Sequence, residues 1–226
     1  MRLREIISEG GNAFKGDLAT QRINKSDVPS TVAWLGKILE LNIADSLLGT
    51  TGKTATSGDI DVGIQDNAGV TKETLVQRLT SWCVRNKLDP RAYVKKSGVN
   101  VHFRTPINGD PKLGHVQTDL MLLPNLELAK FTMTPNFTSK YKDAQKHILL
   151  SSVAKFSGLK WIPTTGLVSR TTGKVVADDP EHMTEILLGP NATTLDLTSV
   201  EGIMRHLDND PEREAKIADA KATLGL

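Results

Sequence analysis

The stretch that decides the fold runs from residue 49 to residue 61 and reads Gly49-Thr50-Thr51-Gly52-Lys53-Thr54-Ala55-Thr56-Ser57-Gly58-Asp59-Ile60-Asp61. Its first half is a glycine-containing turn, and its end begins a predicted strand that continues to residue 64. Side chains two residues apart on a strand point to the same face, so Asp59 and Asp61 project together while Ile60 points away from them. The stretch therefore predicts a turn that leads into a strand with two carboxylates on one face.

Two neighbouring carboxylates repel each other unless a cation lies between them. Mg²⁺ is the hard divalent cation for such oxygen ligands, and in proteins it is usually shared with substrate phosphates. A third candidate ligand, Asp119, lies in the apolar stretch 116–123, where an ionised group is costly to desolvate without a partner or a metal. If that stretch is a strand beside Asp59 and Asp61, the three carboxylates meet on one face, where two ions about 3.5–4 Å apart could hold the attacking and leaving oxygens.

This pattern predicts metal-assisted phosphoryl or nucleotidyl transfer, with Asp119 as a candidate base toward an acceptor hydroxyl. The alternative is that Asp59 and Asp61 lie on an exposed strand face and that Asp119 is a charge at the rim of the sheet. The glycine turn before the pair and the later strand aspartate favour the catalytic interpretation.

The turn resembles a nucleotide-binding P-loop only superficially. A P-loop needs a glycine at position 47, which is Leu47 here, and a long helix should follow the lysine, whereas a strand is predicted. The backbone N–H groups of a glycine turn can still bind phosphate oxygens. Thr50 and Ser57 could add hydroxyl donors and Lys53 a positive charge, although Lys53 could equally be a solvated turn lysine.

Hydrophobic spacing and turn residues divide the 226-residue chain into helices and strands, which together indicate an α+β protein. Helices are predicted over residues 30–39, 71–86, 139–156 and 181–188, over about 199–207 with a capping box at 198–201, and from 210 onward. Strands are predicted at residues 46–48, 59–64, 99–104 and 116–123, with shorter pieces between 161 and 176. Residues 1–29 are expected to form an arm, and the character of the chain changes after Pro124.

Charge is unevenly distributed along the second half of the chain. Residues 137–176 hold seven Lys or Arg residues and one acidic residue, whereas residues 177–214 hold ten acidic residues and two arginines. A basic segment beside an acidic one favours a face that meets a polyanion, and two solvated faces are the alternative. The only cysteine, Cys83, is predicted to be a buried thiol on a helix. The absence of a long apolar run or a signal-peptide pattern favours a cytoplasmic protein without a membrane partner.

These residues resemble the signature of the DNA polymerase beta superfamily of nucleotidyltransferases. The matching features are the Gly49-Thr50 turn, the strand from Ser57-Gly58 through Asp59 and Asp61, and Asp119 on a later strand. The resemblance to family-X polymerases continues more weakly through Leu128-Ala129-Lys130-Phe131-Thr132, through the helix and glycines of 141–167, and through 181–189.

The resemblance implies a nucleotidyltransferase fold with a mixed β-sheet, a palm-like catalytic domain at 30–126 and a smaller thumb-like α/β subdomain at 127–226. It implies that Asp59, Asp61 and Asp119 are catalytic residues that bind two Mg²⁺ ions. The residues near the nucleoside triphosphate would be Gly49, Thr50, Lys53, Ser57 and Gly58, with Phe131 against the sugar or base. An ordinary core position is the alternative for Phe131.

The chain also departs from the family-X pattern. Gln117 and Met121 stand where arginines usually flank the third aspartate, and no lyase or hairpin DNA-binding module is recognisable. The expected activity is therefore transfer of a nucleoside monophosphate from an NTP or dNTP to an acceptor hydroxyl, with a nucleic-acid 3′ end, RNA or DNA, as the acceptor. The alternatives are a non-catalytic nucleotide- or nucleic-acid-binding protein on the same fold, and nucleotidylation of a protein or a small molecule.

Overall fold

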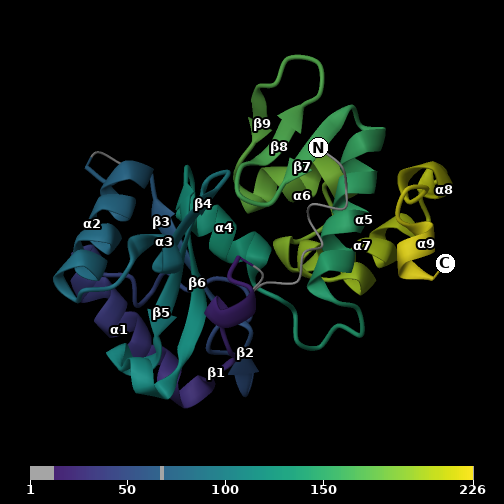
Figure 1. Cartoon of the computed structure of the whole chain (residues 1–226). Helices are drawn as coiled ribbons and strands as arrows, with labels where there is room; N and C mark the ends of the chain where they lie inside the picture. The colour runs from purple at the N-terminus through teal and green to yellow at the C-terminus, as the bar shows by residue number, and fades with distance from the viewer. Residues whose placement is uncertain (1–12, 67–68, 226) are drawn as a thin grey trace. The chain divides into compact units, whose positions relative to one another are not determined.

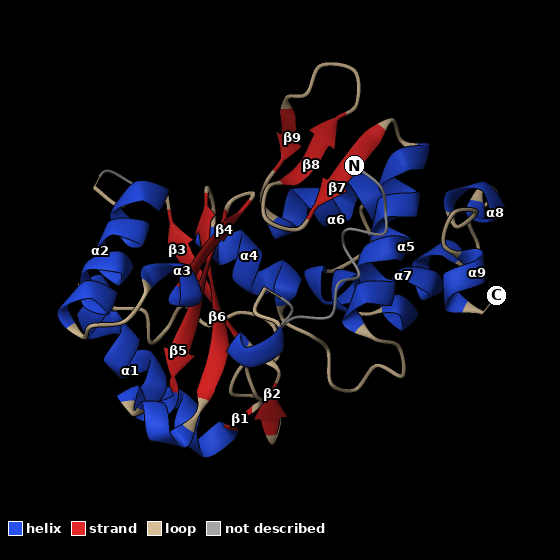
Figure 2. Cartoon of the chain, in the orientation of Figure 1, coloured by secondary structure: helices blue, strands red, loops and turns tan. Residues whose placement is uncertain are grey.

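The computed structural model describes residues 13–66 and 69–225. The chain is a mixed α+β protein that divides into two compact units, Met1–Leu126 and Glu127–Leu226. Each unit has its own hydrophobic core. Figures 1 and 2 show the helices and strands of each unit.

The first unit is built on a four-stranded mixed sheet with the strand order β3-β6-β5-β4. Strands β3 and β6 are parallel, and the other two pairings are antiparallel. Its elements are β1 (Ile23–Asn24), α1 (Val28–Leu39), β2 (Thr56–Ser57), β3 (Asp59–Gln65), α2 (Lys72–Arg85), α3 (Pro90–Tyr93), β4 (Val94–Ser97), β5 (Asn100–Pro106) and β6 (His115–Leu123). Short 3-10 helices lie at Gly16–Leu18, Lys25–Asp27, Ile107–Gly109 and Pro111–Leu113.

Side chains alternate along each strand, so the sheet has one apolar face and an opposite face that is polar around the carboxylates and apolar at Met121 and Leu123. Ile60 and Val62 of β3, Val101 and Phe103 of β5 and Leu120 of β6 join the core that α1 and α2 also enter. The helices lie together beside the sheet in Figure 1. The opposite face carries the odd-numbered side chains of β3 and β6, including all three candidate carboxylates.

Helix α2 confirms the predicted helix at residues 71–86. Thr71 caps it by accepting a hydrogen bond from the Thr74 backbone N–H at 3.2 Å. Leu75, Leu79 and Cys83 are fully buried on the face that meets the sheet, which also confirms the buried thiol. Burial raises the pKa of the Cys83 thiol to about 11, so this cysteine is a core residue with little thiolate.

The start of helix α1 differs from the prediction. The helix begins at Val28, two residues before the expected cap at Ser30, and Pro29 occupies its first turn. Proline is favoured there because its missing N–H would have no partner at a helix start. The preceding residues, 13–27, contain two short 3-10 helices and strand β1, which pairs with β2 and buries Ile23 completely.

Two shorter elements also differ from the prediction. Residues 46–48 form a single bridge, Leu47 to Val62, rather than a full strand. Strand β5 begins at Asn100, and Val99 lies exposed in the turn before it. By contrast, the strands predicted at 59–64 and 116–123 are confirmed as β3 and β6.

The second unit packs helices around a small antiparallel sheet with the order β7-β8-β9. Helix α4 (Leu126–Met133) starts at the last residue of the first unit. The other elements are α5 (Asp143–Phe156), β7 (Leu159–Ile162), β8 (Gly166–Ser169), β9 (Val175–Ala177), α6 (Pro180–Leu188), a 3-10 helix at Thr194–Thr198, α7 (Val200–Leu207), α8 (Arg213–Lys216) and α9 (Lys221–Leu224). Its core includes Leu149, Val153, Leu167, Met183 and Ile203.

The starts of two helices of this unit differ from the prediction. Helix α5 starts at Asp143 rather than near residue 139, because Glu201 accepts hydrogen bonds from the Ser139 hydroxyl and the Lys140 backbone N–H and holds that stretch outside the helix. Helix α7 is capped by Ser199, whose side chain accepts from the Gly202 N–H, and Thr198 belongs to the preceding 3-10 helix.

The single C-terminal helix expected after Asp210 is instead two short helices, α8 and α9. The hydroxyl of Ser152 on α5 donates to the Lys216 carbonyl at 2.7 Å and accepts from the Asp219 N–H at 3.2 Å. These contacts hold a turn between the two helices.

A buried carboxylate joins the 3-10 helix of the second unit to α7. Asp196 accepts hydrogen bonds from the Thr193 backbone N–H and hydroxyl at 2.8 and 2.9 Å. It also pairs with Arg205 and, at 3.0 Å, with His206 Nε2. Burial opposes ionisation, but the hydrogen bonds from Thr193 and the His206 imidazole outweigh it and lower the pKa of Asp196 to about 2.

We expect Asp196→Ala to destabilise the second unit by about 2 kcal/mol near neutral pH, because four donors lose a charged acceptor. A carboxylate whose pKa is lower in the folded state contributes stability above its unfolded pKa and loses it as the pH falls through the folded value. The difference between the wild type and the variant should therefore shrink between about pH 4 and pH 2. Urea unfolding of both proteins at several pH values measures it, and a pH-independent difference would contradict the assignment.

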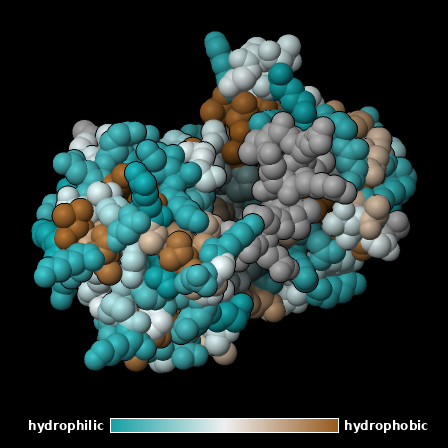
Figure 3. Space-filling view, viewed as in Figure 1, coloured by the Kyte–Doolittle hydropathy of each residue, from teal (hydrophilic) through white to brown (hydrophobic). Residues whose placement is uncertain are grey.

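No helix in residues 13–66 and 69–225 is both long and apolar enough to cross a membrane. The exposed large hydrophobic side chains of the first unit include Val84, Val99 and Leu113. On the face that Figure 3 displays, apolar residues of this unit form separate spots among hydrophilic ones.

Candidate metal centre

Parallel pairing of β3 and β6 brings the three predicted carboxylates together. Asp61 is the direct register partner of Asp119, and Asp59 precedes it on the same face of β3. One carboxylate oxygen from each residue lies within 4.8 Å of those of the other two, so the cluster could hold a metal ion. Strand 116–123 therefore pairs beside strand 59–64, as the sequence predicts.

The glycine turn lies directly against one of these carboxylates. Gly49 has a φ of +59°, and a Cβ atom added to it would lie 3.2 Å from Oδ2 of Asp61. The Leu48 N–H donates to the Asp61 carbonyl at 2.9 Å, and the Asp61 N–H donates to the Thr51 hydroxyl at 3.1 Å. The turn and the strand are thus joined through the backbone of a candidate metal ligand.

The electrostatics of the cluster oppose three negative charges. Burial, followed by the neighbouring carboxylates of Asp59 and Asp119, raises the pKa of Asp61 to about 8. Burial and Asp119 also raise the pKa of Asp59, against opposing contributions from a backbone hydrogen bond and from Arg22. A divalent cation between the carboxylates would instead lower their pKa values, because an opposite charge within a few Å favours the ionised carboxylate.

Asp119 has two side-chain donors of its own. His102 Nδ1 lies 2.7 Å from Oδ1 of Asp119, and Gln117 Nε2 donates to the same oxygen at 2.8 Å. His102 is not among the site residues predicted from the sequence, and Gln117 enters there only as a departure from a family pattern. The alternation of β5 could have placed His102 on a polar face, but its pairing with Asp119 depends on the register between β5 and β6.

The other residues predicted near a triphosphate lie in the turn, in strand β2 and, for Gly58, between β2 and β3. Thr50 and Lys53 are exposed, whereas Ser57 is buried and its hydroxyl donates to the Thr50 carbonyl at 3.5 Å. The Ser57 hydroxyl therefore stabilises the turn itself. A Cβ atom on Gly58 would lie 3.4 Å from Arg22, a cation beside this strand that the sequence analysis missed. Arg22 Nε donates to the Thr56 hydroxyl at 2.9 Å.

Phe131 belongs to the second unit, where it is half-buried on α4. It packs against the core of that unit and lines a cavity of about 530 Å³ together with Lys130, Asn136 and Leu195. Phe131 therefore packs against a hydrophobic core, as the alternative interpretation of this residue expects.

The basic segment at 137–176 is mostly a surface feature. Six of its seven cations are exposed, but Lys146 is only 3% exposed. Lys146 Nζ lies 2.7 Å from Asp143 and donates to the Thr132 carbonyl at 2.9 Å, so it stabilises α5 from inside. Lys155, although exposed, pairs with Asp219 at 2.5 Å.

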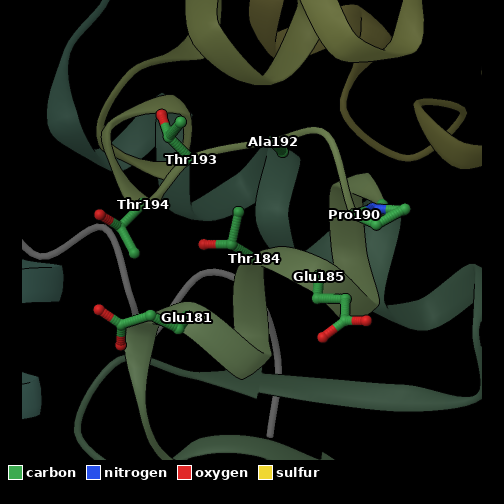
Figure 4. Close-up of a pocket in the computed structure, with 8 residues that line it drawn as sticks. Glu181, Thr184, Glu185, Pro190, Ala192, Thr193 and Thr194 are labelled. Atoms are coloured by element: carbon green, nitrogen blue, oxygen red, sulfur yellow. The ribbon is translucent and has the colours of Figure 1, made fainter.

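A second cavity of the same unit, about 430 Å³, lies beside α6 (Figure 4). Figure 4 shows Glu181, Thr184 and Glu185 on the helix and Thr193 and Thr194 on the chain that follows it. Its lining holds two carboxylates and no basic side chain, which makes it unfavourable for a phosphate. Neither of these two cavities includes an aspartate of the cluster.

No family model and no curated protein sequence matches the chain.

Proposed function

We propose that the protein is a Mg²⁺-dependent nucleotidyltransferase of the DNA polymerase beta type, which transfers a nucleoside monophosphate from an NTP or dNTP to an acceptor hydroxyl. The observation that carries the proposal is the convergence of Asp59, Asp61 and Asp119 on adjacent parallel strands beside a glycine turn. This is the arrangement on which the sequence resemblance depends.

The donor set suits magnesium. Three carboxylates offer hard oxygen ligands, and their mutual repulsion and partial burial give them a strong preference for a cation. Bound Mg²⁺ would neutralise charge on the phosphates and lower the pKa of the attacking hydroxyl. We assign Asp59 and Asp61 as the residues that would hold Mg²⁺ and, through it, the triphosphate, and Asp119 as the residue that would hold Mg²⁺ on the acceptor side.

The glycine turn provides the second part of the site. Gly49 lets the backbone approach the Asp61 carboxylate, and the Thr51 hydroxyl ties the turn to the strand. Phosphate oxygens brought to the metal would therefore lie near the exposed Thr50 and Lys53, which can donate to them. We assign these residues to triphosphate binding.

We further propose a nucleic-acid 3′ end as the acceptor. The support is the group of exposed cations in residues 137–176, which suits a phosphate backbone. Binding through such cations weakens steeply as salt rises, whereas binding of a small neutral acceptor does not.

The test is incubation of the protein with radiolabelled NTPs and dNTPs, Mg²⁺, and RNA or DNA 3′ ends, followed by a denaturing gel. We expect label on a nucleic acid, release of pyrophosphate, and loss of both with a chelator. Label on the protein itself would refute the nucleic-acid acceptor while retaining the chemistry. Absence of pyrophosphate release with every nucleotide and acceptor would refute the enzyme.

A further inference from the structure

His102 and Gln117 both hold the same oxygen atom of Asp119. In the paired strands β5 and β6, His102 is the register partner of Asp119, so its ring lies beside the carboxylate on the polar face. Gln117 is two residues before Asp119 and shares that face. Neither donor occupies the second carboxylate oxygen, Oδ2.

The amide of Gln117 is held in one orientation by the backbone of a distant segment. The Ala13 N–H donates to Gln117 Oε1 at 2.9 Å, which turns the amide nitrogen toward Asp119. The Ala13 carbonyl accepts from Lys95 Nζ at 2.6 Å, and the Lys95 ammonium also lies 4.9 Å from the centre of the Phe14 ring. Residues 13 and 14 are thus anchored to the same sheet by an amide on β6 and a lysine on β4.

We propose that His102 and Gln117 are positioning residues that orient the Asp119 carboxylate toward the metal, and that the Ala13 backbone orients Gln117 in turn. The inference rests on the proposed function, because it takes Asp119 as a metal ligand. Its physical basis is that a ligating carboxylate rotates freely about its side-chain bonds unless other groups hold it. Two donors on one oxygen limit that rotation and leave Oδ2 to face the ion.

A purely structural role for the two residues makes a different prediction. His102 is only 9% exposed and Gln117 only 2% exposed, so either could serve simply to satisfy buried polar groups. In that case substitution would lower stability without a specific change in metal affinity. A variant at position 102 that keeps a hydrogen-bond donor but lacks the imidazole ring distinguishes the positioning role from the structural one.

Asparagine at position 102 provides that variant. Its side-chain amide nitrogen occupies the same place relative to Cβ as the Nδ1 of histidine, so His102→Asn can still donate to Asp119. His102→Leu has a similar size but no donor. Gln117→Met removes the second donor with little change in volume. His115→Leu is the matched control, because His115 is on the same sheet and contacts Tyr93 rather than the carboxylates.

The experiment is a calorimetric titration of the whole 226-residue chain and of each folded variant with Mn²⁺. We expect His102→Leu and Gln117→Met each to weaken metal binding about 10- to 100-fold. His102→Asn and His115→Leu should stay within about threefold of the wild type. If one of the donor-less variants does not fold, the other one and His102→Asn still decide the question.

The outcomes distinguish failure of the positioning role from failure of the proposed function. Wild-type affinity in both donor-less variants, or equal losses in His102→Asn and His102→Leu, would overturn the positioning role and leave the metal site intact. Absence of Mn²⁺ binding by the wild type would overturn the proposed function, and the positioning role with it.

Discussion

Asp61→Asn is expected to reduce nucleotide transfer at least about 1,000-fold, because loss of a direct metal ligand removes several kcal/mol of stabilisation of the developing charge. Asp61 is the central member of the cluster: it is the register partner of Asp119 and follows Asp59 on the same face. An asparagine has the same shape but lacks the negative charge. We expect Asp119→Asn to have a loss of similar size.

Stability distinguishes this effect from unfolding. Burial and two neighbouring carboxylates disfavour the ionised form of Asp61 in the folded protein. A neutral asparagine of equal size therefore should not lower the free energy of unfolding in the presence of a chelator. Thermal unfolding of the wild type and the variant, both in a chelator, measures this directly.

The matched control for Asp61→Asn is Asp66→Asn. Asp66 is an exposed aspartate directly after β3, and its substitution removes the same charge from the end of the same strand without touching the cluster. Its activity should remain within about twofold of the wild type, as is usual for surface substitutions. Full transfer activity in Asp61→Asn would exclude this site as the catalytic centre.

The carboxylate pair on β3 could be predicted from the sequence because it depends on local alternation alone. Asp59 and Asp61 must share a face if residues 59–65 form a strand, and the apolar residues that alternate with them, Ile60 and Val62, require the other face to be buried. Asp119 was identified for a different reason, since a charge in an apolar strand requires a partner.

The environment of Asp119 could not be predicted in the same way. Its partner His102 is 17 positions away, and the contact exists only because β5 and β6 pair with His102 opposite Asp119. A shift of one residue in that register would move the imidazole to the apolar face. The contact with Ala13 is still less local, because it joins residues 104 positions apart.

The errors at helix ends have a related cause. The broken C-terminal helix and the late start of α5 follow from single side chains, Ser152 and Glu201, that bind backbone groups of another segment. Periodicity reports which face of a helix is buried, and it carries no information on such distant contacts. Helix α2 was predicted correctly because its cap, Thr71, and its apolar face are both local features.

Gly49→Ala should reduce transfer about 10-fold and Gly49→Val about 100-fold, because a side chain at this position pushes against a catalytic carboxylate. The added Cβ would lie 3.2 Å from Asp61 Oδ2, a contact tighter than ordinary van der Waals distance. Relief requires a shift of a few tenths of an ångström in either the turn or the carboxylate. A valine adds two methyl groups at the same place and makes the shift larger.

Backbone strain would also lower the activity of the Gly49 variants. Gly49 has a positive φ, so any side chain there costs about 1 kcal/mol of backbone strain. Gly98 separates the two effects. Its φ of +52° resembles that of Gly49, but a Cβ added to it would meet no atom within 4 Å. Gly98→Ala should therefore lose similar stability and keep its activity. An equal loss of activity in Gly98→Ala and Gly49→Ala would show that general strain, and not contact with Asp61, limits the enzyme.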